Sequence, residues 1–288
     1  MHYHICHRTT YNYDRPVALA PHLLRLHPRA SGDQSLRQHQ LVINPQPLNT
    51  SFSLDVAGNT VTQIWFPREQ LIPSLEITAT TEVITHCQNP FDYLLEPWAV
   101  EFPLDYPASL LSQLQGYLAP LGMAASPDPL VGELAATIQQ EVDHNVSLFL
   151  TNLTQRIYER CTYQLRETGR PQIPSITWQN KTGSCRDFTV LFMAVCRSVG
   201  LATRFVSGYT EGEPKAAKYL HAWAEVYLPG GGWRGFDPTL GLAVADRHIP
   251  LAAAALPQEA TPITGSLYYP GGRSTMTYTL EINAIDSK

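Results

Sequence analysis

The spacing of apolar residues changes near residue 90, and this change constrains the fold more than any other feature of the chain. Before it, short runs alternate between apolar and polar residues, as in residues 75–84, and turn-forming residues separate the runs. After it, apolar residues recur at intervals of three and four, which is typical of helices. We therefore expect an α+β protein whose first part, residues 1–95, is a β-sandwich.

The second part begins with a connector rich in proline and aromatic residues, followed by helices. Ser126 and Pro127 predict the start of one helix, as an N-cap and a first-turn proline. We expect a domain over residues 96–255, and a C-terminal segment, 256–288, whose alternating residues form a strand that packs back on the sandwich. The apolar positions of the three expected helices are Leu110, Leu111, Leu114, Tyr117 and Leu118; Leu130, Leu134, Ile138 and Val142; and Leu150, Leu153 and Ile157.

Composition excludes several classes of protein. Charged residues make up 16% of the chain and apolar residues 44%, so it is not a disordered chain. The formal charge is −5, with 20 lysines and arginines against 25 acids, which argues against a nucleic-acid partner. No apolar run approaches the length of a membrane-spanning helix, so no membrane partner is expected. The first eight residues lack the apolar stretch of a signal peptide, and a cytoplasmic protein is expected.

The five cysteines are an odd number, have no metal-type spacing and cannot all pair. In a reducing compartment they are free thiols, so the question is whether one of them is reactive. Cys6, Cys87, Cys161 and Cys196 are interpreted as packing residues.

Cys185 stands at the start of a strongly predicted helix. Ser184 and Asp187 form a capping pattern, and Gly200 is a natural end, so Ser184 is the expected N-cap and Cys185 the first helical residue. A thiol there lies among unpaired backbone N–H groups at the positive end of the helix dipole, and both stabilise a thiolate. The apolar stripe of this helix is Phe188, Leu191, Phe192, Val195, Cys196 and Val199.

A predicted hairpin follows this helix. Residues 221–228 and 233–238 read as two strands around a turn that contains Pro229 and three glycines. This hairpin places His221 and Asp237 at the same end of neighbouring antiparallel strands, where their side chains can pair. A helix-borne cysteine, a histidine and an aspartate supply a nucleophile, its base and the group that orients the base.

Four blocks carry these residues: 183–187 (Gly-Ser-Cys-Arg-Asp), 204–209 (Arg-Phe-Val-Ser-Gly-Tyr), 221–226 (His-Ala-Trp-Ala-Glu-Val) and 235–239 (Gly-Phe-Asp-Pro-Thr). Together they resemble the bacterial transglutaminase-like superfamily, whose members are often described as cysteine proteases. Residues 7–11, 21–26 and 91–94 resemble the β-rich domain that precedes this core in the family, so the resemblance covers nearly the whole chain.

The resemblance implies a papain/transglutaminase-like core, in which a helix-borne cysteine packs on an antiparallel sheet carrying histidine and aspartate. It implies a catalytic triad of Cys185, His221 and Asp237, without cofactor or metal. The expected function is thiol-dependent acyl transfer on peptide or protein amide bonds through a thioester, either hydrolytic or as amine transfer. Animal transglutaminases carry Gln-Cys-Trp at the nucleophile where this chain has Ser184-Cys185-Arg186, so protein crosslinking is not carried over.

Other interpretations remain open at this stage. The chain could be a catalytically silent peptide-binding or scaffold protein that retains the fold, or a thiol acetyltransferase. The Cys185 backbone N–H is one expected oxyanion donor, and the second is undetermined, with Gln179, Trp178, Tyr163 and Gln164 as candidates. Asp187 is interpreted as a cap and Arg186 as a solvated residue. His2, His4 and His7 are interpreted as strand residues rather than metal ligands.

Overall fold

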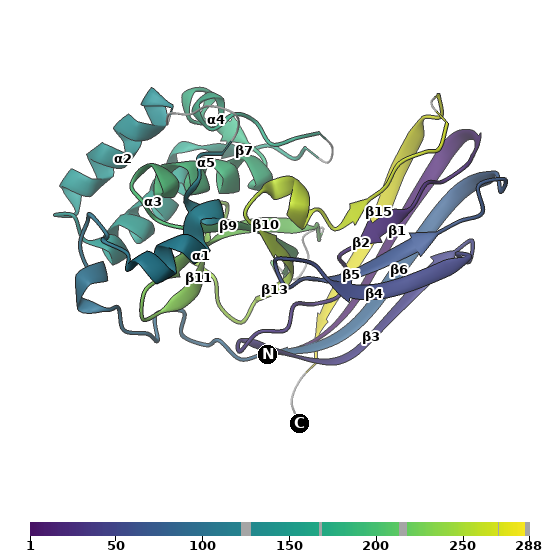
Figure 1. Ribbon diagram of the computed structural model, residues 1–288, viewed down its shortest axis with the longest axis horizontal. Coiled ribbons are helices and arrows are strands. Elements are labelled where there is room, and N and C mark those ends of the chain that lie inside the picture. Colours follow the sequence, from purple (N-terminus) through teal and green to yellow (C-terminus); the bar gives the residue numbers. More distant parts are fainter. Residues whose placement is uncertain (122–127, 167–168, 213–217, 270, 286–288) are drawn as a thin grey trace.

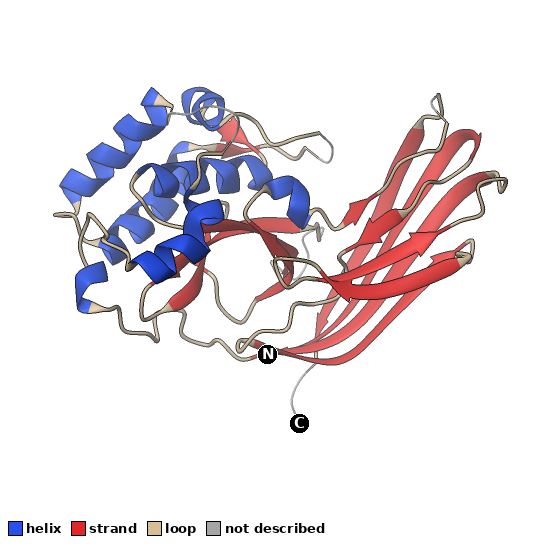
Figure 2. Cartoon of the chain, in the orientation of Figure 1, coloured by secondary structure: helices blue, strands red, loops and turns tan. Residues whose placement is uncertain are grey.

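The computed structural model describes residues 1–121, 128–166, 169–212, 218–269 and 271–285. It is an α+β structure with two parts: helices gathered around a small antiparallel sheet, and a layered group of long strands beside them (Figures 1 and 2). No helix in these described ranges is both long and apolar enough to cross a membrane.

The long strands form the expected N-terminal β-sandwich. One sheet has the order β15-β1-β6-β3 and the other β14-β2-β5-β4, and all pairs are antiparallel. Alternate residues of β1, including Tyr3 and Ile5, face a buried core shared with Ile64 of β5, which explains the period of two in the sequence. The strands are β1 (His2–Val17), β2 (His22–Leu24), β3 (Gln34–Asn44), β4 (Asn49–Leu54), β5 (Thr60–Trp65), β6 (Ile72–Thr85), β14 (Ile263–Thr264) and β15 (Ser274–Ala284).

The helical part surrounds a five-stranded antiparallel sheet of order β12-β11-β10-β9-β13. Its strands are β9 (Thr203–Thr210), β10 (His221–Leu228), β11 (Gly232–Asp237), β12 (Leu242–Ala243) and β13 (His248–Ala254). Helix α5 (Cys185–Ser198) packs on β10 and β9 and buries its apolar stripe there. The remaining elements of this part are η1 (Pro97–Ala99), α1 (Ala108–Leu118), α2 (Pro129–Glu141), α3 (Val146–Arg160), β7 (Thr162–Tyr163), α4 (Pro174–Asn180), β8 (Thr182–Gly183) and η2 (Pro257–Ala260).

The start predicted for the second helix was wrong. Helix α2 begins at Pro129, after Asp128, whose side chain accepts a hydrogen bond from the Leu130 N–H. The sequence has a capping residue followed by proline twice in a row, and the second pair, Asp128 and Pro129, begins the helix. Ser126 and Pro127 lie outside the described residues. The buried face also differs, because Val131 is buried where Leu130, predicted to be inside, is 39% exposed.

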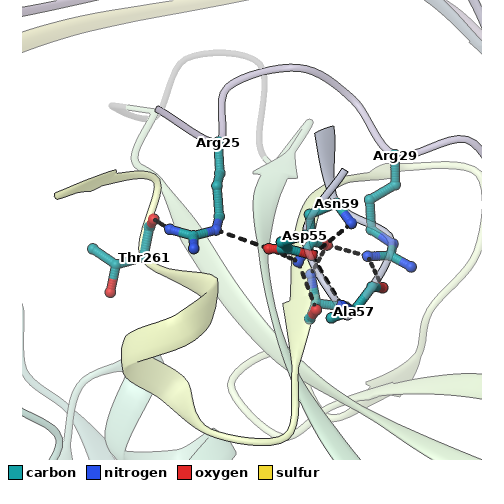
Figure 3. A network of polar contacts seen from close by, with 7 residues as sticks. Arg25, Arg29, Asp55, Ala57, Asn59 and Thr261 are labelled. Carbon is teal, nitrogen blue, oxygen red and sulfur yellow. Dashed lines mark hydrogen bonds and ion pairs between the residues drawn. The ribbon is translucent and has the colours of Figure 1, made fainter. Parts of the chain in front are cut away.

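A short polar network joins the sandwich to the sheet of the helical part (Figure 3). Asn59, which is fully buried, donates to the Ala253 carbonyl at 2.9 Å and accepts from the Ala253 N–H at 2.8 Å. Asp55 accepts from the Asn59 N–H at 2.9 Å and from Arg25 Nε at 3.2 Å, and Arg29 donates to the Asn59 side chain. The β4–β5 turn is therefore fixed to β13, far away in the sequence.

Candidate active site

Cys185 lies at the N-terminus of α5, as the capping pattern predicts. Ser184 precedes the helix, and the buried Asp187 carboxylate accepts from the Ser184 N–H and hydroxyl, both at 2.8 Å. A Cβ on Gly183 would lie 2.8 Å from the Asp187 Cβ, so only glycine fits before this cap. The Cys185 side chain is thus held at a rigid helix start, where backbone N–H groups favour negative charge.

Asp187 does more than cap this helix. Its other carboxylate oxygen accepts from Arg166 and from the Gln172 backbone N–H, the latter at 2.7 Å. Arg186 in turn donates to the Gly169 carbonyl. One buried carboxylate therefore anchors the chain on either side of 167–168 to the helix that carries Cys185.

His221 connects the two other residues of the predicted triad. Its Nε2 lies 2.6 Å from Asp237 Oδ2, and Cys185 is close enough to the ring to act on its charge. Because Nε2 faces Asp237, we assign Nδ1 to the side of the ring that faces the thiol. Burial alone lowers the pKa of His221, but the Asp237 carboxylate and the hydrogen bonds to Asp237 and Cys185 raise it from 6.5 to about 10. The geometry thus favours an imidazolium beside Cys185 at neutral pH.

Asp237 is fully buried and accepts four hydrogen bonds. Thr239 N–H and Leu240 N–H donate to Oδ1 at 2.9 and 3.2 Å, while His221 and His248 donate to Oδ2. Burial raises the pKa of Asp237, and the charges and hydrogen bonds of the two histidines outweigh it, so that the net pKa lies well below its usual range. The carboxylate is therefore ionised and fixed in orientation.

His248 is the residue of this site that sequence reasoning missed. Its Nε2 lies 3.1 Å from Asp237 Oδ2, and its ring packs edge-on to Trp223 with centroids 5.1 Å apart. The run after it is apolar and short, which is typical of a buried strand, and β13 begins at His248 itself, so this run is the signal that places His248 in the sheet.

Two histidines and an aspartate of this site, His221, Asp237 and His248, form the one group in the described parts of the chain that has the composition of a metal site. The ligand atoms of His221, Asp237 and His248 lie within 4.8 Å of one another. Their contacts are hydrogen bonds between imidazole nitrogens and one carboxylate oxygen, and we assign the three residues to that network.

Cys185 and His221 line a cavity of about 1080 Å³ between the two parts of the molecule. Aromatic and aliphatic side chains dominate its walls, and the charged lining residues in the described ranges, besides His221, are the arginines 166, 170 and 186. The sandwich supplies one wall. That wall comprises His7, Thr9 and Tyr11 of β1 and Met276 and Tyr278 of β15.

The four candidates for the second oxyanion donor differ in whether they line this cavity. Tyr163 lines the cavity, and its pKa is raised to about 12 by burial and, to a lesser extent, by the nearby Cys185. Gln164 and Gln179 are exposed and do not line it, and Trp178 packs against the core with Lys181 over its ring.

The remaining histidines and cysteines singled out from the sequence make structural contacts outside the triad. His2 contacts Glu82, and buried His7 contacts Tyr209 and Thr9, with burial lowering its pKa to about 4. All five cysteines are free, and burial raises the pKa of the Cys87, Cys161 and Cys196 thiols.

The fold and the site define an α+β protein of the papain/transglutaminase-like class, with a β-sandwich in front of the core. Residues 3–84 match the bacterial transglutaminase-like N-terminal region, and residues 133–238 match the transglutaminase-like superfamily. The chain therefore carries both a bacterial transglutaminase-like N-terminal region and a transglutaminase-like superfamily core.

Relatives align with nearly the whole of the chain. An uncharacterized protein of Mycobacterium tuberculosis is 29% identical over 297 residues, covering 97% of this chain and 92% of the relative. One of Mycobacterium leprae is 22% identical, covering 98% of each chain. The crystal structure of "a Putative Cysteine Protease from Cytophaga hutchinsonii" superimposes with a TM-score of 0.75 at 19% identity, covering 100% of this chain and 92% of that one, which shows a shared fold.

Proposed function

We propose that the protein is a thiol-dependent acyl-transfer enzyme that acts on amide or peptide bonds. The observation that carries this proposal is the His221 ring, which joins the Cys185 thiol on one side to the buried Asp237 carboxylate on the other. In this proposal Cys185 is the nucleophile, His221 the general base and acid, and Asp237 the group that fixes the imidazole and stabilises its charge.

The proposed reaction has two halves. The Cys185 sulfur, having given its proton to His221, attacks the amide carbon; a C–S bond forms and the carbonyl π electrons move to oxygen. When the tetrahedral intermediate collapses, the C–N bond breaks and His221 returns the proton to the leaving amine, which leaves a thioester. Water, or an acceptor amine, then loses a proton to His221 and attacks the thioester carbon. When this second tetrahedral intermediate collapses, the C–S bond breaks, the carboxylic acid or new amide is released, and the Cys185 thiolate is restored beside the protonated His221. The Cys185 backbone N–H is the expected donor to the oxyanion.

The cavity supports a peptide or protein amide as the substrate. A cavity of about 1080 Å³ holds several residues of an extended chain, and its aromatic and aliphatic walls favour apolar side chains next to the reacting amide. The arginines at positions 166, 170 and 186 favour substrates without positive charge nearby. Because β1 and β15 line this cavity, we assign the sandwich, residues 1–95 with 256–288, a substrate-binding role beside a core formed by residues 96–255. A reducing, cytoplasmic compartment suits a protein whose five cysteines are free.

Activity-based profiling with thioester trapping tests the proposal. Wild-type protein and Cys185→Ala are incubated with a peptide library, and the released fragments and any acyl adduct on residue 185 are identified by mass spectrometry. The proposal requires release and an adduct with wild type alone. Equal release by both proteins would instead favour the catalytically silent scaffold, and an adduct only with acetyl thioesters would favour acetyl transfer.

A further inference from the structure

Two histidines share one oxygen of Asp237. His221 reaches Oδ2 from β10 at 2.6 Å, and His248 reaches the same oxygen from the start of β13 at 3.1 Å. An ionised carboxylate only accepts hydrogen bonds and offers about four lone-pair sites. With two backbone N–H groups on Oδ1, the four contacts saturate the carboxylate.

The surroundings of His248 leave Asp237 as its polar partner. The side chain is 3% exposed, Trp223 covers its ring edge-on, and its Nδ1 has no hydrogen-bond partner among the described residues. An unpaired buried polar atom costs free energy that an apolar side chain of the same volume would avoid. The contact of Nε2 with Asp237 is therefore the feature of this histidine that an apolar residue cannot reproduce.

We propose that His248 is a positioning residue of the active site: its Nε2–H holds the Asp237 carboxylate in place and withdraws negative charge from the oxygen that binds His221. This inference rests on the proposed function, because it assigns His248 to the same thiol chemistry. His248 does not contact the reacting atoms.

The negative charge on Asp237 Oδ2 raises the pKa of His221, so the amount of charge on this oxygen determines how readily His221 releases its proton. A second donor on Oδ2 weakens the pull of Asp237 on the imidazolium, so that His221 releases its proton to a leaving amine more readily. Two titratable groups act on His221, namely Cys185 from α5 and Asp237 from β11, and His248 from β13 acts on Asp237. Without His248, the full charge of Asp237 acts on His221.

Two variants separate this role from simple packing. His248→Phe keeps the ring volume but removes the donor, and His248→Gln keeps a side-chain N–H. The titration of His221 is followed by NMR on protein labelled at histidine Cε1. Each variant also carries Cys185→Ala, so that the thiol does not contribute. The signal that disappears in His221→Asn is assigned to His221.

We expect the His221 midpoint to rise by about half a pH unit or more in His248→Phe and to return toward the wild-type value in His248→Gln. An unchanged midpoint in folded His248→Phe, or the same shift in both variants, would overturn the proposal. If His248→Phe does not fold, the unsubstituted protein still decides, because nitrogen NMR must find the His248 hydrogen on Nε2, and a hydrogen on Nδ1 contradicts the proposal.

Alkylation of Cys185 by iodoacetamide in wild type and His221→Asn keeps the two proposals apart. If His221 does not accelerate alkylation, the proposed function fails. If His221 does accelerate alkylation, but the midpoint of the His221 titration is the same with histidine and with phenylalanine at position 248, only the inference about His248 fails.

Discussion

Asp237 on β11 holds the His221 ring on the neighbouring strand β10 at 2.6 Å, although the two residues do not face each other directly in the strand register. Continuing that register places Trp223 opposite Asp237, so the contact is a diagonal one. The diagonal turns His221 along the end of the sheet, where its other nitrogen meets Cys185 at the start of α5.

The first prediction concerns the reactivity of Cys185. Since His221 is held as an imidazolium beside it, we expect iodoacetamide to alkylate Cys185 at pH 6.5 at least about tenfold faster than a free thiol. Mass spectrometry assigns the modified residue. His221→Asn should remove the difference, and buried Cys196 serves as the internal control. Equal rates for Cys185 and a free thiol would contradict activation.

The second prediction concerns the pH dependence of stability. The pKa of Asp237 is lowered on folding, so its contribution is present above 3.8 and lost as the pH falls below that value. The pKa of His221 is raised, so its contribution is complete below 6.5 and lost as the pH rises through about 10. The free energy of unfolding of wild type should therefore exceed that of Asp237→Ala most between about pH 4 and 6.5, by about 3 kcal/mol. Urea titrations at pH 5.5 and 10 check this; a difference that grows at pH 10 would refute it.

The third prediction concerns the buried carboxylate behind Cys185. Asp187→Ala removes hydrogen bonds to Ser184, Arg166 and Gln172, so we expect a loss of about 3 kcal/mol in the free energy of unfolding. Hydrogen exchange should also accelerate in residues 169–173. Ser184→Ala, which removes only the capping hydroxyl, is the matched control and should cost about 1 kcal/mol. Equal effects of the two substitutions would mean that Asp187 is only a helix cap.

The fourth prediction concerns the junction between the two parts of the molecule. Asn59→Ala leaves the Ala253 N–H and carbonyl without partners, and should lower the free energy of unfolding by about 2–3 kcal/mol. Asn49→Ala, at an exposed position of β4, should change it by less than about 0.5 kcal/mol. Thermal unfolding of both variants measures the difference, and similar melting temperatures would show that the junction does not depend on Asn59.

The fifth prediction concerns Gly208, which pairs with His221 across β9 and β10. An added Cβ would lie 2.3 Å from the Ile249 carbonyl and 2.5 Å from Trp223 Cη2, so Gly208→Ala should cost at least about 2 kcal/mol. Gly116→Ala, in α1 with nothing within 4 Å of the added atom, should be neutral or stabilising. Melting temperatures test the pair, and a folded, unperturbed Gly208→Ala would exclude close packing there.

Local patterns predicted much of the fold and part of the site. The capping pattern located the start of α5, and alternation located the strand of the C-terminal segment, because both depend on neighbours in sequence. His248 and the cavity wall contributed by Tyr11 depend on contacts between distant segments, which leave no local pattern. The start of α2 was misplaced because two capping residues followed by proline compete within four positions.

The sandwich draws its first sheet from both ends of the described chain, since β15 pairs with β1 along eleven residues of each strand. During synthesis, β1 therefore leaves the ribosome long before β15. The edge of β1 that pairs with β15 stays unpaired while the helical part is made. Met276 and Tyr278 complete the wall of the cavity that holds Cys185. A nascent chain thus carries its thiol in an unfinished cavity until β15 has been made, so the order of synthesis itself delays the assembly of the site.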